Sequence, residues 1–421
     1  MRIHVLATLL LLASTSAQAA VWNNRNNWNS SWEERYVSWV RSSWTVNALT
    51  QSTLSNGEAN PFKGMRADCA DTVYTMRFVF AYMNKLPFAI KDPTGSGVLS
   101  NAMSRWDGQS EPAKARAFLN LIYNVGSTRS LPNDSFPVAL SRSYVKPGIM
   151  LLATQKNHHS WTLQNMLSIG VPHLVFNSTI GATSGSKLQE RTSWPNPGWV
   201  FEGDQTPSGH AGFRAFRPLA YLGRPVWDVP GYSEEQYRIP LSQWTSRATG
   251  KLATQKEGDQ AKMDRLMKAA CDAFKQRVSS VNEGVQARAS IGRCMTYAEY
   301  DTYSTPSRDE RLFDDLMALR SGFKSASKMD QKTLRRLRKI FPAVQSGARA
   351  ENQAMRAQGV TADSFCVVEY RRGVSMDLSE MKRRLFAGAV SNNPNDDIQA
   401  RWGERRGSNS CQSWGEWAPN L

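Results

Sequence analysis

The spacing of hydrophobic and polar positions changes twice along the chain. Residues 73–83 are apolar nearly all round apart from Arg77, which predicts a buried helix. From Tyr144 the pattern alternates in short runs rich in β-branched and aromatic residues, separated by Gly, Pro, Ser and Asn, which is typical of strands. From about residue 251 the chain becomes charged and helical in period. This order predicts an α+β fold followed by a mostly helical C-terminal region.

A tryptophan-rich arm, residues 20–60, precedes the buried helix. Ser31 and Glu34 have the spacing of a capping box, so we expect a helix to begin there. Four aromatic or apolar residues then share one stripe at helical period: Trp32, Tyr36, Val40 and Trp44. The stripe predicts a helix packed on the main body, and a platform for glycan or lipid is the alternative interpretation.

The buried helix places a cysteine at its amino end. Asp68 is a suitable N-cap, which puts Cys69 in the first turn, and the segment from Asn84 to Pro87 ends the helix. The unsatisfied N–H groups of a first turn lower the pKa of a thiol and can stabilise an oxyanion. Cys69 is therefore a candidate nucleophile, with a buried structural cysteine as the alternative.

Three of the five histidines fall in the first predicted hairpin. A period of two puts His159 on one face with Trp161 and Leu163, and His158 on the other. We expect the apolar face to meet the Cys69 helix, which makes His159 the candidate base and His158 incidental. Because the two histidines point to opposite faces and no HExxH motif is present, no metal site and no cofactor are predicted.

The turn of this hairpin selects the third residue. A reversal at residues 168–170 places Asn177 opposite His159, and His173 opposite Leu163. An amide can hold the imidazole of a Cys-His pair in the required tautomer. The sequence therefore predicts the catalytic set Cys69, His159 and Asn177, with His173 as the reserve for the third position.

The N-terminus and the charge indicate where the protein acts. Residues 1–19 read as a signal peptide, with Arg2, the apolar run VLATLLLLA and the cleavage site Ala17-Gln18-Ala19. We therefore expect export to the periplasm or beyond and no transmembrane segment. The net charge is +16, from 52 basic and 36 acidic residues, without a nucleic-acid-binding motif. The predicted partner is cell-wall peptide or another anionic envelope polymer, and not nucleic acid.

Five cysteines in an oxidising compartment leave one unpaired. The last four lie in the C-terminal region, and pairing of nearest neighbours, Cys271 with Cys294 and Cys366 with Cys411, is the simplest of three connectivities. We expect Cys69 to be the free thiol.

The motifs resemble those of the papain-like cysteine hydrolases. ADCADTVY, KLPF, VKPG and the following histidine are similar to the NlpC-type cell-wall endopeptidases, whose third residue His173 would match. HSWTLQ and VFNST are similar to transglutaminase-like proteins, with Asn177 in place of their Asp. The resemblance implies a papain-like domain and a cysteine peptidase or amidase acting on peptidoglycan.

The sequence thus divides into four parts. These are the signal peptide 1–19, the arm 20–60, a papain-like catalytic domain 61–250, and a disulfide-stapled helical region 251–421. The leading hypothesis is an exported cysteine hydrolase. The alternatives are a transglutaminase-like acyltransferase and a non-catalytic envelope-binding protein.

Overall fold

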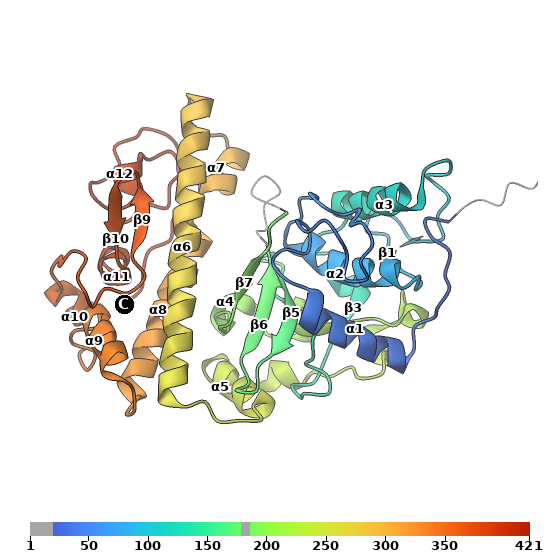
Figure 1. Cartoon of the computed structure of the whole chain (residues 1–421), viewed down its shortest axis with the longest axis horizontal. Helices are drawn as coiled ribbons and strands as arrows, with labels where there is room; N and C mark the ends of the chain where they lie inside the picture. Colours follow the sequence, from blue (N-terminus) through green and yellow to red (C-terminus); the bar gives the residue numbers. More distant parts are fainter. Residues whose placement is uncertain (1–19, 178–185) are drawn as a thin grey trace, which may run out of the picture.

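The computed structural model describes residues 20–177 and 186–421, so the predicted signal peptide lies outside the described residues. Helices and a six-stranded antiparallel sheet form the N-terminal half, and the C-terminal half is mostly helical. The α+β class is therefore confirmed. In Figure 1 the long helix α6 (Asp259–Ile291) stands between the sheet and the last part of the chain, residues 368–401.

Three helices precede the sheet: α1 (Ser30–Ser43), α2 (Cys69–Met83) and α3 (Glu111–Val125). The N-cap of α1 is Asn29, which accepts a hydrogen bond from the Trp32 amide, and not Ser31 as the capping-box spacing predicted. The N-cap of α2 is Asp68, as expected, and it forms a capping box with Asp71. Both ends of the predicted Cys69 helix are thus confirmed.

The tryptophan-rich arm packs on α2, as predicted for the stripe. Tyr36, Val40 and Trp44 are buried in one hydrophobic cluster with α2. The ring centroids of Tyr36 and Phe80 are 5.3 Å apart, and the Arg77 guanidinium lies 3.4 Å from the centre of the Trp28 ring. The arm and α2 therefore share one core.

The sheet has the order β3-β8-β4-β5-β6-β7, with every neighbouring pair antiparallel. Its strands are β3 (Ser135–Pro137), β4 (Met150–Leu152), β5 (Ser160–Met166), β6 (Pro172–Phe176), β7 (Gln189–Arg191) and β8 (Gly212–Phe216). The β5–β6 reversal lies at residues 167–171, as predicted. The register is different, because Leu163 pairs with Leu174 and His173 pairs with Asn165 across an irregularity at Gln164. The predicted pairing of His173 with Leu163 is therefore wrong.

The two faces of the sheet are both buried, against different partners. Thr162 and Val175 face the arm and α2, and the Trp44 Nε1–H donates to Thr162 Oγ1 at 2.9 Å. Trp161, Leu163 and Phe176 face a second cluster that contains residues of α5 (Leu241–Leu252). The expectation that the face of His159 and Trp161 meets the Cys69 helix is thus wrong. The alternation of residues along β5 separates its side chains into two faces. It does not show which face α2 covers, because both faces are buried.

Two disulfides staple the C-terminal half: Cys271–Cys366 and Cys294–Cys411. The nearest-neighbour connectivity is wrong because α6 holds Cys271 mid-helix and ends just before Cys294. At ~1.5 Å per residue, these two cysteines lie about 35 Å apart along the helix direction. Cys69 is the free cysteine, as predicted.

The remaining elements are short or belong to the helical half. They are β1 (Ala89–Lys91), β2 (Val98–Ser100), α4 (Pro197–Val200), α7 (Tyr297–Tyr303), α8 (Pro306–Ser325), α9 (Gln331–Ile340), α10 (Ala348–Ala354), β9 (Val368–Arg371), β10 (Val374–Met376), α11 (Leu378–Phe386) and α12 (Ile398–Arg401). Within the described residues, no helix is both long and apolar enough to cross a membrane.

The halves meet through a polar interface between β7 and α8. The Arg191 guanidinium and the Asp315 carboxylate form an ion pair at 3.3 Å, and both side chains are buried. The Ser193 hydroxyl donates to the same carboxylate oxygen at 2.9 Å. Separating a buried ion pair leaves uncompensated charges and is strongly destabilising. The pair therefore helps to hold β7 and α8, and with them the two halves, in one orientation.

Candidate functional site

The Cys69 thiol is buried at the amino end of α2. The residue is 2 % exposed, and its Sγ lies 3.2 Å from Thr128 Oγ1 and 3.6 Å from the His158 carbonyl oxygen. Burial, and then the Asp68 carboxylate, raise the pKa of this thiol to about 12, while contacts with Thr128 and Ser160 act in the opposite direction. Desolvation therefore outweighs the helix-end effect on which the sequence argument relied.

His159 does not meet Cys69. Its ring packs edge-on against Trp161 at 4.3 Å, Phe176 at 5.8 Å and Trp199 at 6.1 Å between centroids, on the sheet face away from α2. In the described part of the chain, no hydrogen bond joins His159 to Cys69. Burial, followed by Arg191 and other arginines, lowers the pKa of His159 to about 3, so the ring is neutral.

His158 lies closer to the thiol than the sequence argument allowed. Its backbone carbonyl accepts from the Thr128 hydroxyl at 3.3 Å, and its ring Nε2 is 2.9 Å from an Arg129 guanidinium nitrogen. Adjacent residues, Thr128 and Arg129, thus contact the Cys69 thiol and the His158 ring respectively. His158 has a φ of 44°, in the left-handed region that non-glycine residues rarely adopt.

Asn177 lies on the Cys69 side of the sheet. It is 2 % exposed, and its amide donates to the carbonyl oxygen of Ala67, two residues before the cysteine, at 2.8 Å. Since Thr162 pairs with Val175, the register continued by two residues brings Asn177 beside Ser160 and not His159. The predicted pairing of Asn177 with His159 is therefore wrong, although Asn177, just beyond the end of β6, also lines the cavity that contains His159.

His173 lies elsewhere. Its ring Nε2 is 3.0 Å from the Glu190 carboxylate on the neighbouring strand β7, and the side chain is partly exposed. The cross-strand position opposite Asn165 places it toward the turn of the hairpin, away from Cys69. The contact with Glu190 accounts for this histidine without a catalytic role.

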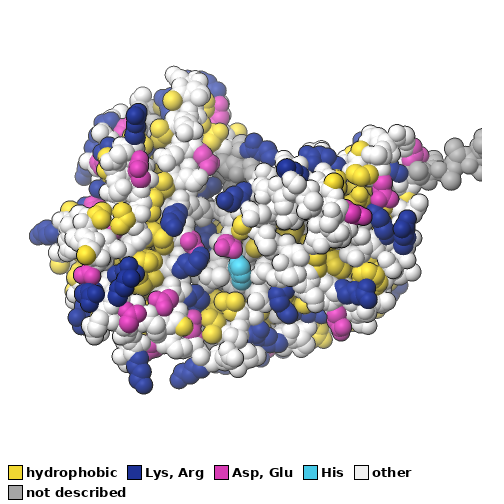
Figure 2. Space-filling view, viewed as in Figure 1, with side chains coloured by type: hydrophobic (Ala, Val, Ile, Leu, Met, Phe, Trp, Pro, Cys, Tyr) yellow, Lys and Arg dark blue, Asp and Glu magenta, His cyan; other side chains and the backbone are white. Residues whose placement is uncertain are grey.

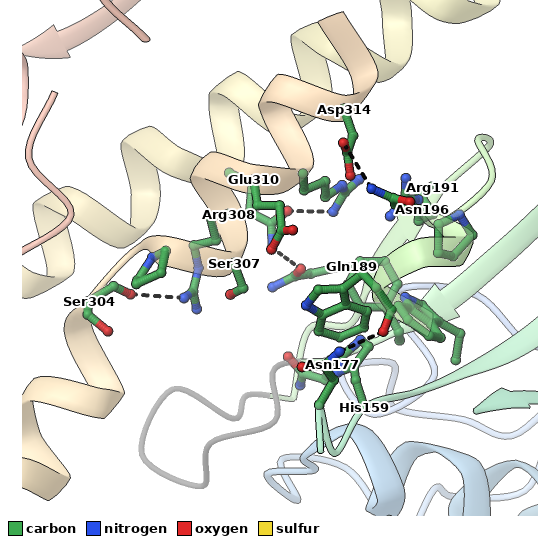
Figure 3. Close-up of a pocket in the computed structure, with 18 of the residues that line it drawn as sticks. His159, Asn177, Gln189, Arg191, Asn196, Ser304, Ser307, Arg308, Glu310 and Asp314 are labelled. Atoms are coloured by element: carbon green, nitrogen blue, oxygen red, sulfur yellow. Dashed lines mark hydrogen bonds between the residues drawn. The ribbon is translucent and has the colours of Figure 1, made fainter. Parts of the chain in front are cut away.

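A cavity of about 300 Å³ opens on the His159 side, between the sheet and α8. Figure 3 shows His159 and Arg191 from the sheet side facing Arg308, Glu310 and Asp314 of α8 across it. Burial, followed by neighbouring carboxylates, raises the pKa of Glu310 to about 7, and burial raises that of Asp314 to about 6.

Sequence reasoning missed the α8 side of this cavity. Arg308, Glu310, Arg311 and Asp314 come from the stretch SRDERLFDD, about 150 residues after His159 in the chain. A charged run opening a helix is ordinarily a solvated face, and only the packing of α8 on the sheet buries it. No local signal in this stretch pointed to the hairpin.

Comparison with known proteins adds no relative: no family model, curated protein or solved structure matches the chain. Among residues 20–177 and 186–421, no group of three or more His, Cys, Asp or Glu side chains is placed to hold a metal ion. The proposals below therefore rest on the residues and their geometry.

Proposed function

We propose that the protein is an exported cysteine hydrolase of papain-like type, with Cys69 as nucleophile and His158, rather than His159, as base. The observation that carries the proposal is the position of the thiol. It lies at the amino end of a capped helix, 3.6 Å from the His158 carbonyl, and on the sheet face shared with Asn177. A nucleophile, a histidine and an amide at one end of a buried helix are the elements of a Cys-His-Asn site.

The described conformation is a resting one in this proposal. The thiol is protonated at neutral pH, and Arg129 holds the His158 ring. The left-handed φ of His158 costs about 1–3 kcal/mol. Relaxation of this residue would free the ring from Arg129 and bring it to Sγ, where it takes the thiol proton. The thiolate then attacks the substrate carbonyl, the ring passes the proton to the leaving amine, and water releases the acyl group from the thioester.

Asn177 and the helix end have supporting roles. The Asn177 amide binds the Ala67 carbonyl oxygen and so anchors the backbone that leads into Cys69. The Ala70 and Asp71 N–H groups of the first turn are bound to the Asp68 carboxylate, so the Cys69 N–H is the first-turn donor that would stabilise the oxyanion.

The substrate we propose is a peptide or amide bond of the cell wall. The net charge of +16 favours an anionic polymer, and two disulfides are consistent with an oxidising compartment. In Figure 2, Lys and Arg side chains are spread over both halves of the visible face, where they would attract an anionic polymer. Transfer of the acyl group to an amine instead of water would use the same residues.

The experiment compares the mature wild-type protein with Cys69→Ala on peptidoglycan and on a casein–amine pair, with products read by mass spectrometry. We expect cleaved stem peptides from the wild type and none from the variant. Amine-coupled casein instead would identify the acyltransferase. Equal activity of the two proteins would refute Cys69 as the nucleophile.

One observation favours a non-catalytic envelope-binding protein: the buried thiol has a pKa of about 12. Iodoacetamide alkylation at neutral pH, with and without peptidoglycan, separates the two functions. A hydrolase that opens around substrate should show faster Cys69 alkylation when wall fragments are present. A binding protein should show a slow rate that the fragments do not raise.

A further inference from the structure

The cavity between β5–β7 and α8 does not contain the Cys69 thiol, which lies on the other face of the sheet, and Asn177 is the one residue of the proposed hydrolytic site that also lines it. The cavity is nevertheless a formed one with polar groups that lack protein partners. Its volume of about 300 Å³ lies at the lower end of the range for small-molecule sites, and is enough for a single sugar ring.

One wall of the cavity is aromatic. Trp161, Phe176 and Trp199 surround the His159 ring, and the Trp161 and Trp199 ring centroids are 5.8 Å apart. Tryptophan faces bind the C–H surface of a sugar ring well, because the ring buries apolar area while its hydroxyls remain at the edge.

The opposite wall carries arginines. The Arg308 side chain has one hydrogen bond in the described structure, from Nη1 to the Ser304 carbonyl oxygen at 3.2 Å, and it forms no ion pair there. The Nε atoms of Arg308 and Arg311 are buried without a hydrogen-bond partner. Arg311 Nε nevertheless lies 3.8 Å from the Asp315 carboxylate as an ion pair, so Arg308 is the guanidinium of this wall that lacks an anionic partner among the described residues. Buried guanidinium N–H groups without acceptors indicate a missing anionic partner, and a carboxylate fits their fork geometry.

His159 also has ring nitrogens without hydrogen-bond partners among the described residues, although the side chain is only 8 % exposed and lines the cavity. A neutral imidazole offers one donor and one acceptor, which a hydroxyl group can satisfy. Glu310 lines the same cavity and forms no hydrogen bond or ion pair in the described chain, so its carboxyl group is a second partner for a hydroxyl.

We propose that this cavity binds one acidic sugar unit of an envelope polymer. The sugar ring packs on Trp199 and Trp161, its carboxylate binds Arg308, and its hydroxyls bind His159 and Glu310. The site is a binding site and not a catalytic one, and it stands independently of the role of Cys69.

Two pairs of probes test the carboxylate and distinguish its source. Methyl glucuronide and methyl glucoside differ by one carboxylate and represent uronic-acid polymers. N-acetylmuramic acid and N-acetylglucosamine differ by one carboxylate-bearing group and represent wall glycan. Binding to the mature protein is measured by calorimetry and by ligand-observed NMR. We expect the acidic member of at least one pair to bind at least about tenfold more tightly than its neutral partner.

Variants locate the binding. Arg308→Gln should abolish the preference for the acidic sugar, whereas Arg247→Gln, a change at an exposed arginine of α5, should leave it intact. Trp199→Ala should weaken both members of a pair. The melting temperature of Arg308→Gln checks that the variant is folded. Equal affinity for acidic and neutral sugars, an unchanged preference in Arg308→Gln, or no binding of any probe at millimolar concentration would each overturn the proposal.

Discussion

The two faces of the β5–β6 hairpin differ in what covers them and in what chemistry they offer. One face meets the arm and α2, where Ser160 contacts the buried thiol and Thr162 accepts a hydrogen bond from Trp44. The other face presents His159 and Trp161 to a cavity shared with α8. The adjacent histidines therefore belong to different sites, although they are neighbours in sequence. Both residues precede β5, and His158 has a left-handed φ, so their separation comes from the local backbone turn and not from strand alternation.

The largest effect should separate the two histidines. His158→Gln should lower the rate of hydrolysis by about 10²–10⁴-fold, the usual contribution of a general base. His159→Gln should change the rate little, because its ring lies on the other face. Single-turnover rates on peptidoglycan fragments provide the measurement, with binding of an acidic sugar as the readout for His159. An inactive His159→Gln variant together with an active His158→Gln variant would identify His159 as the base and refute the role proposed for His158.

Asn177→Ala should have the next largest effect, a fall in kcat of up to about 10³-fold with KM nearly unchanged. The reason is that its amide anchors the Ala67 carbonyl next to Cys69, and misplacement of the nucleophile acts on the chemical step. His173→Ala is the control, since its ring pairs with Glu190 and should be silent in the assay. A larger loss in the His173 variant than in the Asn177 variant would favour the Cys-His-His arrangement.

Packing should distinguish the faces as well. Leu163→Ala, on the cavity side, removes a fully buried side chain and should lower the free energy of unfolding by about 2–5 kcal/mol. Thr162→Val, on the α2 side, keeps the volume but leaves the Trp44 Nε1–H without its acceptor, at a cost of about 1–3 kcal/mol. Urea unfolding of both variants gives the comparison. A Thr162 variant as stable as the wild type would show that Trp44 finds another acceptor.

These contrasts also explain which features could be predicted from the sequence and which could not. The buried helix from Cys69, its Asp68 cap, the hairpin turn and the free thiol were predictable, because each depends on residues close in sequence. The side of the sheet that α2 covers was not, because Trp161 and Thr162 are both fully enclosed and hydrophobicity does not rank two buried faces. The cavity could not be predicted either, because Arg308 and Glu310 come close to His159 only when the two halves pack together. The disulfide connectivity likewise depends on the length of α6, which keeps Cys271 and Cys294 apart.

The last prediction concerns pH and the buried carboxyl groups on the α2 side. Asp134 accepts hydrogen bonds from the Tyr74 hydroxyl at 2.9 Å and the Lys91 amide at 2.7 Å, and burial raises its pKa to about 7. The folded state therefore holds a proton that the unfolded state releases above its ordinary pKa of about 4. Stability from this group should fall as the pH rises from about 4 to 7, by up to about 1.4 kcal/mol per pH unit.

Asp134→Asn should flatten that decline, because the amide is neutral at every pH. Part of the slope should persist, since burial also raises the pKa of Asp71 to about 8. Asp92→Asn is the control: hydrogen bonds from Thr94 lower the pKa of Asp92, so its contribution changes only below the pH range of the test. Unfolding free energies from urea titrations between pH 5 and 7 measure the three slopes. An Asp134 variant with the wild-type slope would mean that the carboxyl group is ionised in the folded protein. The hydrogen bonds from Lys91 and Tyr74, together with Arg217, would then lower its pKa more than burial raises it.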